Sequence, residues 1–224
     1  MSPQALTKKN VCNQDFESYE AYRDILVFNK ETGIEARILS LNSSEDSLLL
    51  EQYYLMRHNS YRGEYGFEDY VGSRSKDDER GFIIAVYDSN RRVLGGSRVM
   101  VRKFDSDELL SNEFEGTQYT FGNVFKIAYN KDLPKPYGEI SAVVVVEGYR
   151  DTKIMAMMLD ISAEFFKRNN VSFAFGVAPK IHCINYKIIS SRIGYKTQIL
   201  KDFLWKKNEI YNSIDMFPVI VSDK

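Results

Sequence analysis

A carboxylate, an apolar strand and a basic turn follow one another between residues 139 and 155. Glu139 and Ser141 precede four consecutive valines, Val143–Val146, and a run of this kind is typical of a buried strand. Directly after the valines comes a turn with charged and hydroxyl side chains: Arg150, Asp151, Thr152 and Lys153. The segment therefore offers an acid at one end of a strand and anion-binding groups at the other.

Basic charge is concentrated where that strand ends. The formal net charge of the chain is only −1, but residues 150–207 carry 11 Lys or Arg against 4 Asp or Glu, a net of +7. Such a region can attract a phosphate, an acidic carrier protein or a nucleic acid. The alternative is an ordinary solvated face.

The composition predicts one soluble domain spanning residues 1–224, with an N-terminal helical segment at about 1–33 packing on it. Of the 224 residues, 44% are hydrophobic, enough for one sizeable core. Two cysteines are too few for a disulfide framework, which favours a reducing compartment and hence the cytoplasm. No stretch reaches the roughly 18 apolar residues of a membrane span, and no metal site is expected.

Hydrophobic periodicity predicts an α+β protein with a mixed sheet. The pattern is an antiparallel hairpin over residues 82–103, then strand, helix, strand and helix with one parallel crossover. Ile154, Met158, Ile161 and Phe165 form one buried helical stripe. The expected helices are 16–28, 47–62 (capped by Ser43 or Ser44), 106–111, 152–170 and 180–194, and the expected strands are 33–39, 139–146, 171–177, 197–205 and 216–221.

The order of these elements resembles the fold of the GCN5-related N-acyltransferases (GNAT superfamily) over about residues 35–205. The resemblance implies an α/β/α sandwich. It also implies that the strand before the central helix diverges from its neighbour and holds the pantetheine arm of an acyl thioester.

Within that superfamily the chain is most similar to the N-acyl-homoserine lactone (autoinducer) synthases and the N-acyl amino acid synthases. Three local features carry the likeness. Arg98 in GGSRVMV takes the place of a family arginine, Glu139 and Ser141 in GEISAVVV match a Glu-x-Ser motif, and Asp78 lies in an acidic cluster before a strand. Ala142 stands where the family has another arginine, which leaves the amine acceptor open.

The resemblance implies a donor held through a single phosphate. Acetyltransferases of this fold bind the coenzyme A pyrophosphate with a glycine-rich loop, but Lys153 and Met155 replace both glycines here. Acyl carrier protein, which is acidic and has one phosphate, is therefore favoured as donor over acyl-CoA, with no tightly bound cofactor. The expected donor contacts are Arg150, Thr152 and Lys153 to the phosphate and the backbones of Val143 and Val145 to the pantetheine amides.

The implied chemistry is attack by an amine on a thioester, which needs a neutral amine. Glu139 is the candidate to take the ammonium proton or to bind the amine, with Ser141 beside it. Arg98 could bind a substrate carboxylate, or Arg98 and Glu139 could be a structural pair. The tyrosine that protonates the thiolate in many acetyltransferases falls at Ser190, with Tyr186 one helical turn earlier.

Aromatic and arginine side chains are interleaved between residues 53 and 74, where Arg57 and Arg62 are candidates for a lid or an acyl-pocket wall. Core packing and an exposed loop are the alternatives, and no nucleic-acid motif frames these residues. His182 and Cys183 are not expected to act as a pair, because adjacent helical residues point about 100° apart.

The sequence thus predicts an N-acyltransferase that moves a medium or long acyl chain to a small amino-acid-like amine. Two alternatives remain open: a short-chain acyl-CoA-dependent acetyltransferase of the same fold, and a non-catalytic module that binds acyl groups or carrier protein.

Overall fold

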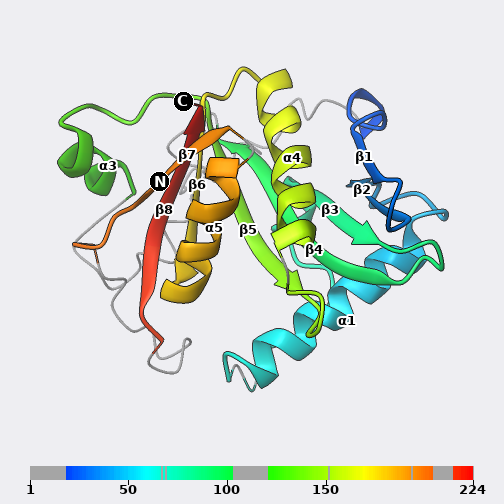
Figure 1. Ribbon diagram of the computed structural model, residues 1–224. Coiled ribbons are helices and arrows are strands. Elements are labelled where there is room, and N and C mark those ends of the chain that lie inside the picture. Colours follow the sequence, from blue (N-terminus) through cyan, green and yellow to red (C-terminus); the bar gives the residue numbers. More distant parts are fainter. Residues whose placement is uncertain are drawn as a thin grey trace, which may run out of the picture.

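The computed structural model describes residues 19–66, 68, 70–102, 121–150, 152–192, 194–203 and 214–223. These residues contain one eight-stranded sheet with the order β1-β2-β3-β4-β5-β6-β8-β7 (Figure 1). The strands are β1 (Leu26–Asn29), β2 (Ile34–Leu39), β3 (Phe82–Tyr87), β4 (Val93–Arg102), β5 (Tyr137–Val145), β6 (Phe173–Pro179), β7 (Tyr195–Ile199) and β8 (Met216–Asp223). Only β5 and β6 are paired in parallel; the other neighbouring strands are antiparallel.

Helices cover both faces of the sheet. On one face, α4 (Thr152–Arg168) crosses from β5 to β6 and lies beside α5 (Lys180–Arg192) (Figure 1). On the other face, α1 (Ser47–Gly63) packs on β3, β4 and β5, and α3 (Phe121–Tyr129) packs near β6 and β8. The fold is therefore a mixed α+β sandwich with helical layers on both sides, as the sequence predicts.

Alternation along the strands explains this arrangement. In β3, Ile84 and Val86 pack in the cluster that contains α4, whereas Ile83 and Ala85 pack in the cluster that contains α1. All four side chains are fully buried. A strand that is apolar on both faces needs a cover on each side, and FIIAVY provides both apolar faces.

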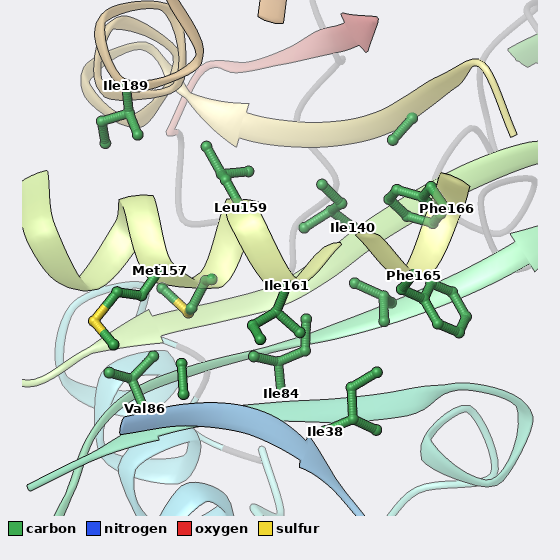
Figure 2. Close-up of a cluster of buried hydrophobic side chains, with 14 of the residues drawn as sticks. Ile38, Ile84, Val86, Ile140, Met157, Leu159, Ile161, Phe165, Phe166 and Ile189 are labelled. Carbon is green, nitrogen blue, oxygen red and sulfur yellow. The ribbon is translucent and has the colours of Figure 1, made fainter. Parts of the chain in front are cut away.

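Helix α4 supplies the centre of the larger core. The predicted stripe of Ile154, Met158, Ile161 and Phe165 is buried, with at most 2% of any of these residues exposed. Figure 2 shows Ile161 and Phe165 facing Ile84 and Ile38 of the sheet. The stripe prediction is confirmed.

Other predictions of local structure need correction. Residues 16–28 were expected to be helical, but the described part has a 3-10 turn at Tyr19–Ala21 followed by β1, which extends the sheet. Asp46, rather than Ser43 or Ser44, occupies the N-cap position of α1. The predicted helix at 106–111 lies outside the described residues.

Candidate active site

The sheet opens between β5 and β6. The register of these strands joins Gly138 to Ala174 and Glu139 to Phe175. Farther along, β5 remains paired with β4 as far as Val145, and β6 remains paired with β8 as far as Pro179. The described backbone of β5 from Ile140 onward therefore borders an opening, the divergence that the GNAT resemblance implies.

A bulge in β5 sets which side chains face α1. The register with β4 shifts at this point, and Ala142 has a φ of 51°, a left-handed conformation that costs a non-glycine residue on the order of 1–3 kcal/mol. Tyr53 on α1 donates a hydrogen bond of 2.9 Å to the carbonyl oxygen of Ala142. The extra residue reverses the alternation, so Ser141 and Val144 both lie toward α1.

Two small cavities follow the opening. One, of about 80 Å³, is lined by Val143, Val145 and Arg150, and the other, of about 60 Å³, is lined by Ser141, Ala142 and Val143. Tyr65 and His182 line both cavities. The structure thus brings three of the predicted donor-binding residues, Val143, Val145 and Arg150, to one place.

A buried carboxylate at Asp78 holds two arginines beside this opening. Asp78 accepts hydrogen bonds of 2.9 Å from both terminal nitrogens of Arg57 and one of 3.2 Å from Arg98. Arg98 also donates to the hydroxyl of Ser141 at 3.1 Å. Asp78 is 0% exposed and Arg57 2% exposed. Burial alone would raise the pKa of Asp78, but the hydrogen bonds and charge of Arg57 hold that pKa below its usual value.

Glu139 is paired with an arginine that sequence reasoning did not single out. Its Oε2 accepts hydrogen bonds from Nε of Arg102 at 3.0 Å and from the Nη2 of Arg102 at 2.5 Å. Both residues are buried, at 2% and 3% exposed. The structural pairing of Arg98 with Glu139 is electrostatic: the hydrogen bonds of Arg98 go to Asp78 and Ser141, while the charges of Glu139 and Asp78 help to keep the pKa of Arg98 above its usual value despite its burial.

The turn after β5 carries the predicted phosphate contacts. Arg150 is half-exposed, donates to the carbonyl oxygen of Val145 at 3.4 Å and forms an ion pair with Glu64 at the end of α1. Lys153 is exposed on the first turn of α4. Thr152 begins α4, and its side chain lies outside the described set. The side chain of Met155 faces the same cavity as Arg150.

The remaining candidates are distributed between core and surface. Arg57 is buried among the rings of Tyr53, Tyr54 and Tyr70, at 5.1 to 5.9 Å from the ring centroids, so it is a core cation rather than a lid residue. Arg62 is exposed. Tyr186 is buried beside the smaller cavity, and burial raises the pKa of its hydroxyl.

Sequence reasoning missed His182 at the opening and Arg102 as the partner of Glu139, whereas Tyr65 lies in the stretch between residues 53 and 74 that was predicted to form a lid or pocket wall. Arg102 lies four residues after Arg98, and strand alternation puts both on one face, a signal that the sequence contains. His182 was considered only as a partner of Cys183. The structure agrees that the two diverge, because Cys183 is buried in the core with its Sγ 3.3 Å from the carbonyl oxygen of Ala178.

The fold is that of the GNAT-like acyltransferases. The chain is similar to the acyl-homoserine lactone synthase LasI, with a TM-score of 0.56, 11% identity and coverage of 85% of this chain and 90% of LasI. It is also similar to BjaI, a CoA-dependent acyl-homoserine lactone synthase solved with S-adenosylmethionine (SAM) and isopentyl-CoA (TM-score 0.55, 19% identity, 84% of each chain).

A third similar structure is FeeM, an N-acyl amino acid synthase from uncultured soil microbes (TM-score 0.50, 9% identity, 84% of this chain and 90% of FeeM). No protein-family model and no curated protein matches the chain. The likeness to the autoinducer synthase branch is therefore a likeness of fold. Within the described residues, no helix is long and apolar enough to cross a membrane.

Proposed function

We propose that the protein is an N-acyltransferase that moves a medium or long acyl chain from acyl carrier protein, or from acyl-CoA, to the amine of a small amino-acid-like acceptor. The observation that carries this proposal is the divergence of β5 from β6 after Glu139. An opening bordered by strand backbone can pair with the amides of an extended pantetheine arm, as an added strand would.

A larger cavity supports a medium or long acyl chain. It has a volume of about 560 Å³, within the range of roughly 300–1,000 Å³ that is usual for ligand pockets. Its apolar lining includes Leu159, Phe166 and Ile140, which Figure 2 shows close together. Ile140 lines this cavity and also the smaller one beside Ser141, so the larger space adjoins the site that we assign to the thioester.

Carrier protein is the favoured donor because of the side chains around Arg150. Lys153 and Met155 stand where a pyrophosphate loop would have glycines, and Met155 faces the cavity that Arg150 lines. Arg150, Thr152 and Lys153 would contact one phosphate, and the net charge of +7 over residues 150–207 would attract an acidic partner.

The acceptor site is assigned to the α1 face of β5. Arg98 and Asp78 hold Ser141 beside the smaller cavity, and Glu139 supplies negative charge two residues earlier on the same face. Because Arg102 already hydrogen-bonds to the carboxylate of Glu139, we assign Glu139 to attracting and orienting the amine and not to taking its proton.

The experiment is incubation of the purified protein with acylated carrier protein and acyl-CoA donors of several chain lengths and with pooled amino acids, with products identified by mass spectrometry. Acylated amino acids made from medium or long carrier-protein donors are expected. Consumption of short acyl-CoA alone would contradict the donor assignment, and no turnover with any donor would favour a binding module.

The Glu139→Gln variant tests the role of the carboxylate. It should lower kcat/KM for the amine by about 10-fold, the effect of losing a charge-assisted contact of about 1.4 kcal/mol. Unchanged turnover would remove Glu139 from the mechanism.

A further inference from the structure

His182 and Tyr65 meet at the opening from opposite sides. His182 lies in the first turn of α5, and Tyr65 follows the end of α1. The Tyr65 hydroxyl is 3.4 Å from Nδ1 of His182, and the two rings are close to perpendicular. Both residues line the two cavities that share Val143, so their side chains border the path assigned to the thioester.

Glu139 does not occupy this position. It is buried against Arg102 and is not among the residues that line either small cavity. The two cavities have one imidazole at their junction, and an imidazole can both accept and donate a proton near neutral pH. A proton carrier at this point is therefore chemically distinct from the Glu139 carboxylate, which is buried on the α1 face of β5.

The surroundings of His182 favour the neutral ring. Burial lowers its pKa below the usual 6.5, Glu64 opposes that shift and Arg150 adds to it. Burial also raises the pKa of Tyr65 to about 12, so its phenol stays protonated. The titratable and charged groups that face the imidazole are Glu64, Tyr65 and Tyr61 from the end of α1, Arg150 from the turn after β5, and Tyr186 from α5 itself.

We propose that His182 is a catalytic residue that carries the proton of the acyl transfer, and that Tyr65 is the positioning residue that fixes its tautomer. This inference rests on the proposed function. For Nε2 to accept a proton, Nδ1 must hold the ring hydrogen and donate it to the hydroxyl oxygen of Tyr65.

The proposed step balances without any further reactant. The neutral amine forms a C–N bond with the thioester carbonyl carbon, and Nε2 of His182 takes one proton from the nitrogen. The C–S bond then breaks, its electron pair leaves with sulfur, and the imidazolium returns the proton to the thiolate. The products are the amide and the free thiol, and His182 is again neutral.

The test compares His182→Gln with His58→Asn. His58 is the other of the two histidines; its Nδ1 accepts a hydrogen bond from the backbone of Gly72, away from the cavities, and Asn can keep that bond. We expect His182→Gln to lower kcat/KM by about 10²-fold, since general acid–base catalysis contributes roughly 10²–10⁴-fold. His58→Asn should retain the wild-type rate.

The pH profile separates proton transfer from structure. In the wild-type protein, kcat/KM should rise with pH through a pKa below 6.5, because the ring must be neutral to act as a base. In His182→Gln, the rise of kcat/KM at low pH should disappear. The rise at higher pH, which comes from deprotonation of the substrate amine, should remain. His182→Ala should recover activity on addition of imidazole, whereas Tyr65→Phe should lower kcat several-fold and leave KM unchanged.

Failure of this inference can be told apart from failure of the proposed function. If the wild-type protein turns over but His182→Gln keeps its rate and its low-pH limb, the His182 assignment is wrong and the acyltransferase proposal stands. A readout without turnover is the long-range proton–nitrogen NMR spectrum of His58→Asn, in which His182 is the sole histidine. A neutral Nδ1–H form at pH 7 is expected; an Nε2–H form would overturn the assignment.

Discussion

Replacing Asp78 by Asn tests whether the buried charge cluster holds the site together. Asp78 neutralises Arg57 and Arg98 and also accepts hydrogen bonds from the backbone and hydroxyl of Ser75, at 2.8 and 2.9 Å. Asn keeps the shape of the side chain but removes the charge, which leaves two guanidinium groups facing each other without their shared partner. Because Arg57 is deeply buried, water cannot reach its guanidinium group to replace the lost carboxylate.

The expected loss of stability is large. Removing one partner of a buried ion pair typically costs about 3–5 kcal/mol, because the remaining charge is left uncompensated. With a urea m-value of about 2–3 kcal/mol/M, such a loss lowers the unfolding midpoint by roughly 1–2.5 M. Asp77→Asn is the matched control, since Asp77 is 3.9 Å from Arg98 with a side chain that is 32% exposed, and a partly solvated pair of this kind is worth at most about 1 kcal/mol.

Urea unfolding followed by circular dichroism measures both variants, and pH gives a second check. The folded-state pKa of Asp78 is lowered, so its contribution is present above the unfolded value of 3.8 and is lost as the pH falls through the folded pKa. The difference in free energy of unfolding between the wild-type protein and Asp78→Asn should therefore become smaller below about pH 4. If Asp78→Asn loses less than about 1 kcal/mol of unfolding free energy at pH 7, or no more than Asp77→Asn loses, the reasoning is refuted.

Two other substitutions test the packing and the donor site. Gly138→Ala should destabilise by about 1–3 kcal/mol in thermal or urea unfolding, because the added Cβ would lie 2.5 Å from the ring of Phe166; Gly63→Ala, with no atom within 4 Å, should not. Arg150→Gln should raise KM for a carrier-protein donor and weaken its dependence on salt, whereas Lys30→Gln, exposed in the turn between β1 and β2 and outside the basic region, should change neither. Equal KM values for the two variants would exclude Arg150 from donor binding.

Hydrophobic periodicity was sufficient to predict the helices with one clear apolar stripe and the strands with clear alternation. The stripe on α4 and the alternation of the hairpin over residues 82–103 are local patterns, and the structure contains both. The prediction for 16–28 failed because the last three residues of the segment join an edge strand: Val27 packs on the core, while Leu26 and Phe28 are about half-exposed. Edge position is a tertiary property that no window of sequence contains.

The candidate site was only partly visible for the same reason. Arg98, Ser141 and Glu139 follow from motif order, and the structure places them on adjacent strands. Their partners, Asp78 for Arg98 and Arg102 for Glu139, depend on how distant segments and strand register bring them together. Tyr65 and His182 are 117 positions apart in the chain, so only the folded arrangement brings them together.

The divergence of β5 from β6 creates an edge strand in the interior of the sheet. An edge strand on the outside of a protein offers free backbone groups to any passing chain and invites aggregation. Here the corresponding stretch after Glu139 lies inside the sheet, where it borders cavities of about 60 and 80 Å³ that Tyr65 and His182 also line. The unpaired backbone thus lies within the sheet and not at its outer border. The protein can therefore keep a strand edge for a ligand without adding an exposed edge for another chain to pair with.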